Sequence, residues 1–138
     1  RILESDFAMR LKNLHQLLKE VKGLDEERLK AIRDRLEKAV TDIKAEVDGN
    51  RFEQELIYYL EKLDITEEKV RLENHLNYFE ETMSSDTSNG KKLGFISQEI
   101  GREINTIGSK ANYAPMQQIV VQMKDELEKI KEQMLNVL

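Results

Sequence analysis

Apolar residues recur every three or four positions over residues 3–21 and again over residues 29–47, which is the spacing of one face of an α-helix. Gly23 separates the two stretches, and the acidic run Asp25–Glu27 that follows it is typical of a helix start. Because each helix must bury one apolar stripe, we expect residues 1–47 to form a long antiparallel helical hairpin. A single helix continuing through Gly23 is the alternative.

Four further helices follow from the pattern. The turn residues 48–50 precede a third helix with apolar positions over residues 52–63. The run Asp64–Glu67 has the spacing of a capping box, with Asp64 as N-cap and Glu67 reaching back, and it opens a fourth helix. The small, polar residues 84–90 predict a mobile loop. A fifth helix is expected from about Lys91 to Asn112, and Pro115 suits the first turn of a sixth.

No stretch has the alternation of a β-strand, so we expect an all-α fold, a bundle of about six helices. Residues 1–47 would be its projecting hairpin and residues 48–138 its second part, together one structural unit. The 138 residues suffice for one domain. The chain starts at Arg1 without an initiator methionine, so we expect it to be part of a longer protein with an N-terminal domain missing here.

Composition removes several function classes. The absence of cysteine excludes disulfides and thiolate metal sites. No apolar run approaches the roughly 20 residues of a membrane span, so no membrane partner is expected. The net charge of −5 argues against a surface that binds nucleic acid everywhere but leaves room for a local basic patch. Phosphate-binding glycine loops, serine–histidine triads and zinc spacings are missing.

The fifth helix carries the most unusual pattern. About 100° from its apolar stripe lies a charged stripe: Glu99, Arg102, Glu103, Thr106 and Lys110. A third face holds amides and glycines: Gln98, Gly101, Asn105, Gly108 and Asn112. Glycine on a helix face lets another backbone come close, either a neighbouring helix or a phosphodiester strand. Helix packing with a salt-bridged edge and a ligand-facing surface are therefore both open.

The charged stripe has groups suited to phosphate chemistry. Glu99 and Glu103 are one turn apart and could share a divalent cation, Mn²⁺ or Mg²⁺, through oxygen ligands. Arg102 and Lys110 could then hold phosphate oxygens. The alternative is an ordinary surface, because glutamates four residues apart beside basic residues are common on exposed helices. In the ligand-facing reading, this stripe points outward.

His75 lies on the polar flank of the fourth helix with Glu68, Arg71 and Tyr78. A histidine at such a place is either an inert surface residue or a general acid or base, since imidazoles ordinarily titrate near neutral pH. The basic residues Lys91 and Lys92 could extend a phosphate-binding strip with Arg71. Platforms that stack nucleobases usually have aromatic residues between the basic ones. We find no such pattern in this segment, and Tyr113 is the one aromatic residue that we place near it.

Four runs of sequence resemble one known family: NRFEQEL at 50–56, DITEEKVRLENHL at 64–76, GKKLGFISQEIGREINTIGSK at 90–110, and the tail at 124–137. Through these runs, the chain from Asn50 to its end resembles the C-terminal domain of the YicC-like (YicC/YloC) family. Residues 3–47 match only in helical character. The resemblance implies a bacterial, cytoplasmic, metal-dependent endoribonuclease with two domains that assembles into ring-like homo-oligomers, hexamers in the expected case.

The resemblance also assigns motif residues in this chain. They are Glu53, Gln54, Glu55, Arg71, His75, Lys92, Gln98, Glu99, Arg102, Glu103, Asn105, Thr106, Ser109 and Lys110. Two positions depart from the family pattern: Gly94 stands where aspartate is usual and Gly101 where asparagine is frequent. If that aspartate helps to bind metal, the site of this protein is built differently.

Pattern and resemblance together predict metal-dependent hydrolysis of RNA phosphodiester bonds. The expected catalytic residues are His75, Glu99, Arg102, Glu103 and Lys110, with Glu99 and Glu103 holding the metal. The expected RNA-binding residues are Arg71, Lys91, Lys92, Gln98, Asn105 and Ser109. Two functions of other classes compete with this: a non-catalytic RNA-binding or adaptor module, and an oligomerisation platform for a longer protein.

Overall fold

The computed structural model describes residues 2–43, 48–84 and 90–137. Over these ranges it has five helices and no strand, which confirms the all-α prediction. The helices are α1 (Ile2–Ile43), α2 (Gly49–Lys62), α3 (Thr66–Met83), α4 (Gly90–Ala111) and α5 (Ala114–Val137). The predicted loop at 84–90 lies mostly outside the described residues. None of these helices is long and apolar enough to cross a membrane.

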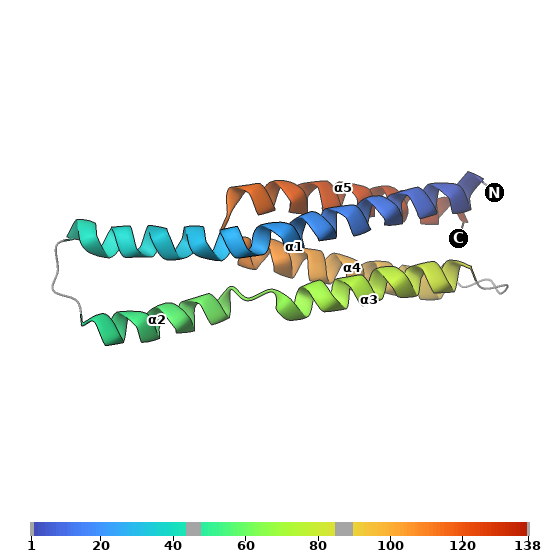
Figure 1. The fold of residues 1–138 in the computed structure, drawn as a ribbon. Helices are drawn as coiled ribbons and strands as arrows, with labels where there is room; N and C mark the ends of the chain where they lie inside the picture. Colours follow the sequence, from blue (N-terminus) through green and yellow to red (C-terminus); the bar gives the residue numbers. More distant parts are fainter. Residues whose placement is uncertain (1, 44–47, 85–89, 138) are drawn as a thin grey trace.

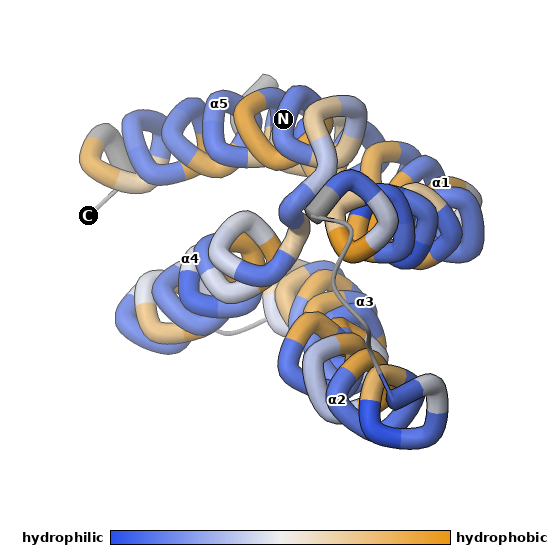
Figure 2. Tube along the Cα trace, turned by 90° about the vertical axis from the view of Figure 1, so that its left-hand side faces the viewer, coloured by the Kyte–Doolittle hydropathy of each residue, from blue (hydrophilic) through white to orange (hydrophobic). Residues whose placement is uncertain are grey.

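Four helices form the bundle: the first half of α1 together with α3, α4 and α5 (Figure 1). Viewed from the end, α1 and α5 make one layer and α3 and α4 the other, and α2 continues the row of α3 (Figure 2). Neighbouring helices run in opposite directions, and both chain ends lie at the same end of the bundle (Figure 1). The core is aliphatic, apart from Phe79 of α3, which meets Phe7 of α1 edge to face with ring centroids 5.9 Å apart.

The predicted N-terminal hairpin is wrong, because α1 is one helix of 42 residues that runs straight through Gly23. A helical glycine costs only about 1 kcal/mol relative to alanine, which contacts beyond it can offset. Asp25 supplies such contacts instead of starting a new helix. Its carboxylate accepts hydrogen bonds from Arg28 Nε at 2.8 Å and from Lys69 Nζ of α3 at 2.6 Å. About six helices were predicted, and the described residues form five.

Arg28 ties three helices together at the point where α1 leaves the bundle. Its side chain is fully buried. The guanidinium donates to the carbonyl of Leu63 at the end of α2, and to the carbonyls of Lys110 and Ala111 at the end of α4, at 2.9–3.1 Å. These carbonyls lack partners within their own helices, so one buried cation satisfies the C-terminal ends of two helices.

Beyond Arg28 the chain forms an arm, consisting of α2 and the part of α1 from Leu29 on (Figure 1). Ile32 of α1 and Leu56 of α2 are buried in its seam, outside the main core. Asp48 caps α2 by accepting a hydrogen bond from the backbone N–H of Asn50 at 3.0 Å, so the helix starts within the predicted turn at residues 48–50.

The predicted capping box at the start of α3 is wrong, because the N-cap residue is Ile65, without a side-chain cap hydrogen bond, and the Glu67 carboxylate accepts from Arg71 instead. Asp64 Oδ1 still accepts hydrogen bonds from the backbone N–H of Thr66 at 3.2 Å and from its hydroxyl at 2.6 Å. Asn112 ends α4 in the left-handed region, with φ at 48°, a conformation that asparagine tolerates better than most residues. Pro115 lies in the first turn of α5, as predicted.

Candidate metal and phosphate site

The polar edges of α3 and α4 meet along one side of the bundle. Leu72, Leu76 and Phe79 point from α3 into the core, and Ile100, Ile104 and Ile107 do so from α4. Burying these stripes brings the adjacent charged faces together into a pocket of about 440 Å³. Its lining residues are Arg71, His75, Glu99, Arg102, Glu103 and Thr106. Two catalytic predictions from different helices, His75 and the glutamate pair, thus meet in one place.

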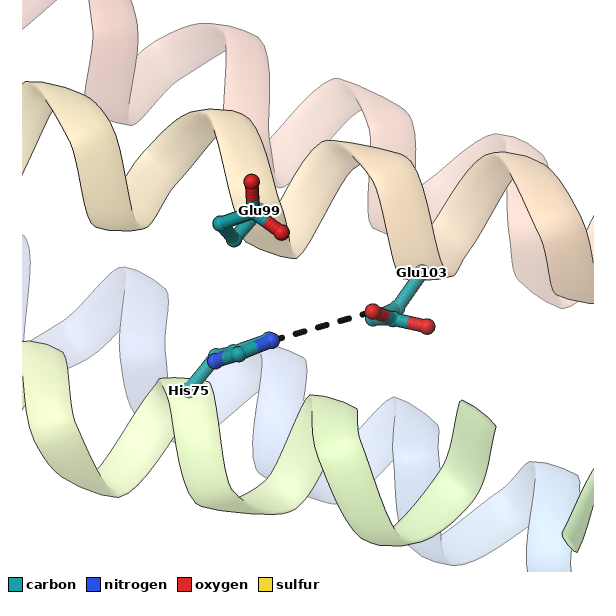
Figure 3. A group of neighbouring side chains, drawn as sticks. All are labelled: His75, Glu99 and Glu103. Carbon is teal, nitrogen blue, oxygen red and sulfur yellow. Dashed lines mark ion pairs between the residues drawn. The ribbon is translucent and has the colours of Figure 1, made fainter. Parts of the chain in front are cut away.

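His75, Glu99 and Glu103 form a compact cluster of possible metal ligands (Figure 3). One ligand atom from each lies within 4.8 Å of the others. His75 Nε2 is 3.7 Å from Glu103 Oε2. The two carboxylate oxygens suit a divalent cation of the Mn²⁺ or Mg²⁺ kind, with positions left for water and phosphate. The glutamate pair therefore fits the predicted cofactor, and His75 beside it can act as a further ligand or as the proton acceptor, but not as both through Nε2.

Glu103 does not point freely outward, in contrast to the expectation for the charged stripe. It is 6% exposed and lies beneath Arg71 of α3, whose Nε donates to Oε1 at 3.2 Å. Arg71 also donates from Nη1 to Glu67 at 3.0 Å. The pKa of Arg71 is raised above its ordinary value, first by the hydrogen bond to Glu103 and then by that to Glu67. A buried carboxylate needs such a cation, because charge without a partner is expensive to bury.

Lys110 is engaged outside this pocket. Its ammonium donates to Glu68 Oε2 at 2.9 Å and to the carbonyl of Asp64 at 3.1 Å. Glu68 is buried, and its Oε2 also lies 3.8 Å from an Arg71 nitrogen. Glu68 therefore links Lys110 to the pocket through Arg71. The pairing of Arg71 with Glu103 was not predicted from the sequence.

Of the predicted RNA-binding residues, Arg71 lines the pocket. The predicted catalytic residue Arg102 is exposed and lines it too, as does Thr106, which donates to the Arg102 carbonyl. Asn105 lies in a different hollow, between α4 and α5. Ser109 donates to the carbonyl of Asn105, and Gln98 is exposed on α4. The motif residues Glu53, Gln54 and Glu55 lie on α2 in the arm, where Glu53 pairs with Arg33 at 2.8 Å.

The glycine face of α4 packs against α5. Of the two predicted roles for this face, helix packing and ligand binding, the structure therefore supports helix packing. A Cβ on Gly101 would lie 3.1 Å from Leu127, and one on Gly108 would lie 3.1 Å from Val120. A Cβ on Gly94 would lie 3.6 Å from Met134 Cε, which also belongs to α5. A side chain at position 94 therefore points away from His75 and Glu103, and the Gly94 departure removes no ligand from this cluster.

The sequence analysis placed Tyr78 beside His75 without giving it a role, and it missed Phe95. Lys91 and Lys92 are exposed in the first turn of α4, and Lys92 Nζ lies 4.9 Å from the centre of the Tyr78 ring on α3. Phe95, one turn further along α4, is 64% exposed. The four-residue spacing of Phe95 and Glu99 was the available signal, since it places an aromatic ring on the charged face.

Comparison with known proteins identifies the chain. Residues 21–138 match the family model described as endoribonuclease YicC-like, C-terminal. The match starts within α1, earlier than the resemblance from Asn50. "Probable endoribonuclease YicC" of Clostridioides difficile is 36% identical over 98% of this chain and 47% of its own length. The Haemophilus influenzae protein of the same name is 33% identical over 76% of this chain and 37% of its own. The chain thus spans less than half of each relative. It belongs to the YicC-like family and carries that family's C-terminal domain.

Proposed function

We propose that this domain provides the catalytic groove of an endoribonuclease that hydrolyses RNA phosphodiester bonds with the help of a divalent metal. The observation that carries the proposal is the cluster of His75, Glu99 and Glu103 within 4.8 Å, in a pocket also lined by two arginines. Ligands for a cation beside donors for phosphate oxygens are the two parts that phosphodiester hydrolysis requires. The names of the curated relatives support the RNA substrate.

Each residue has a distinct part in the proposed reaction. Glu99 and Glu103 would hold the cation, which when bound neutralises phosphate charge and makes a water more acidic. Arg102, exposed at the rim, donates to phosphate oxygens in the fork geometry of its guanidinium. The oxygen of water bonds to phosphorus and its proton passes to His75 Nε2. The bond to the leaving ribose oxygen then breaks, that oxygen takes up a proton from solvent water, and His75 releases its proton to solvent. Lys110 acts at a distance by fixing Glu68 beside Arg71.

The decisive experiment is cleavage of labelled RNA by the highly purified protein in its natural full length, with Mn²⁺ or with a chelator. Glu103→Gln should lower cleavage by at least about 100-fold. Its Tm should change by less than about 5 °C, because glutamine keeps the shape of glutamate and can still accept from Arg71. Cleavage by Glu103→Gln at the unmodified rate would remove the site from the mechanism.

Glu80→Gln is the matched control. Like Glu103, Glu80 is a carboxylate beside a histidine, with its Oε1 3.0 Å from His15 Nε2, but it belongs to α3 and lies outside the pocket. This variant should cleave at the unmodified rate. A protein that binds RNA in this assay without cutting it, with or without metal, would instead be an adaptor module. Assembly into a hexameric ring stays a prediction from the family resemblance, and a mass measurement of the full-length protein tests it.

A further inference from the structure

The pocket between α3 and α4 that holds His75, Glu99 and Glu103 is part of a surface groove between these helices, the α3–α4 groove. Two exposed aromatic rings lie at one end of this groove. Tyr78 of α3 is 42% exposed, and Phe95 of α4 is 64% exposed. Rings of this size are usually withdrawn from water, since burying one stabilises a fold by roughly 2 kcal/mol. Lys92 joins the pair by placing its ammonium 4.9 Å from the centre of the Tyr78 ring. The groove thus ends in two accessible rings and a cation.

Helical spacing places these groups next to the candidate metal site. Tyr78 lies three residues after His75 on α3, and Phe95 lies four residues before Glu99 on α4, so each ring is one turn from a possible metal ligand. Lys92 lies seven residues, two turns, before Glu99 on the same face. From one end of the groove to the other, an aromatic zone is therefore followed by the carboxylate–histidine cluster and then by Arg71 and Arg102.

A second tyrosine with a lysine over its ring shows what is special about Tyr78. On α2, Lys62 Nζ lies 4.5 Å from the centre of the Tyr58 ring. That pair is four residues apart on a single helix of the arm, an ordinary neighbour contact. The Tyr78–Lys92 pair instead bridges α3 and α4, so the ring is held at the junction of the two helices that build the pocket.

We propose that Tyr78 and Phe95 form a stacking subsite for an unpaired nucleobase next to the phosphate that is cleaved. The inference rests on the proposed function and adds the class of substrate, which is single-stranded RNA. Base–aromatic stacking tolerates any base, and Lys92 supplies a cation for the neighbouring phosphate. A base in a duplex has both faces covered by its neighbours, so duplex RNA cannot use the subsite.

The test compares two short single-stranded RNAs that differ at one nucleotide next to the mapped cleavage position. In one RNA this nucleotide has its base, and in the other it is abasic. Steady-state cleavage is measured with Mn²⁺ for the full-length protein and its variants. For the unmodified protein, loss of the base should raise KM by about five- to 100-fold with little change in kcat. Tyr78→Ala should raise KM similarly for the intact RNA and should no longer distinguish the intact RNA from the abasic one.

Tyr78→Trp should restore a low KM and the distinction, because a larger ring also stacks, whereas Tyr78→Leu should not. Tyr58→Ala is the control with the same residue type and the same kind of lysine contact, and it should behave as the unmodified protein. If Tyr78→Ala still discriminates against the abasic RNA, or if duplex RNA is cut as well as single strands, the subsite is refuted. If the unmodified protein cuts no RNA, the proposed function fails first.

Discussion

Arg71 and Glu103 face each other across the α3–α4 groove, with Arg71 Nε 3.2 Å from Glu103 Oε1, while the other carboxylate oxygen faces His75 at 3.7 Å. One buried carboxylate thus lies between a permanent cation and a possible metal ligand. In the absence of metal, Arg71 supplies the positive charge that Glu103 needs. A divalent cation in the cluster would share that carboxylate with Arg71, and the two positive groups would repel each other.

The first prediction follows from this competition. Arg71→Gln should bind Mn²⁺ about three- to tenfold more tightly, because it removes a positive charge close to the ion. Calorimetric titration with Mn²⁺ measures the change. Arg33→Gln is the matched control, since Arg33 also pairs with two glutamates, Glu37 and Glu53, but in the arm. Weaker Mn²⁺ binding by Arg71→Gln would mean that Arg71 orients Glu103 rather than competing for it.

The second prediction concerns Arg28. Arg28→Met should lower the free energy of unfolding by about 3–5 kcal/mol, because it removes the donor to the carbonyls at the ends of α2 and α4 and leaves Asp25 with Lys69 as its remaining partner. Urea unfolding followed by circular dichroism measures the loss. Arg35→Met on the exposed face of α1 should change stability by less than about 0.5 kcal/mol. Equal effects of the two substitutions would contradict the role given to Arg28.

The third prediction separates two glycines inside helices. Nothing lies within 4 Å of a Cβ added at Gly23, so Gly23→Ala should raise the free energy of unfolding by about 0.5–1 kcal/mol through helix propensity. A Cβ at Gly108 would lie 3.1 Å from the stiff, branched side chain of Val120, so Gly108→Ala should instead lower it by about 1 kcal/mol. Thermal or urea unfolding of both variants measures the two changes. An equal gain in the free energy of unfolding at both sites would mean that Val120 and α5 shift to accommodate the added methyl group.

The fourth prediction is a pH effect at the start of α3. The pKa of Asp64 lies below its ordinary value of 3.8, first because the Thr66 hydroxyl donates to the carboxylate. A carboxyl whose pKa is lowered by folding stabilises the fold above its unfolded pKa, and this contribution is lost as the pH falls through the folded value. Carbon-detected NMR titration should show the low pKa, and Thr66→Ala should raise it towards 3.8. An unchanged pKa in that variant would assign the shift to other neighbours.

Sequence reasoning succeeded where a helix end carries its own chemical signal. Pro115 marked the start of α5 because its fixed φ angle acts locally, and the turn residues 48–50 announced the start of α2. It failed at Gly23, where the local signal for a break was real but weak. Contacts between Asp25 and Lys69, 44 residues apart, keep the helix going, and such partners are not visible in a pattern of single residues.

At the candidate site too, features within one helix could be predicted from the sequence, whereas contacts between helices could not. The spacing of Glu99 and Glu103 on one helix was readable, because residues four apart always share a face. Whether that face is open or covered depended on α3, and periodicity alone does not say that Arg71 lies over Glu103. The stacking of Lys92 on Tyr78 likewise joins two helices. The residues were therefore largely predictable from sequence, whereas their pairing required the packing of α3 against α4.

The antiparallel neighbourhood of α1 and α5 has a consequence for how the protein is made. A ribosome releases the chain from its N-terminal side, so α1 emerges before α5. The apolar core side chains of α1, from Phe7 to Val21, lack the cover of α5 until α5 itself has been synthesised. During that interval they are exposed to chaperones and to other nascent chains, and a transcript truncated before Ala114 would yield a product that cannot close its core.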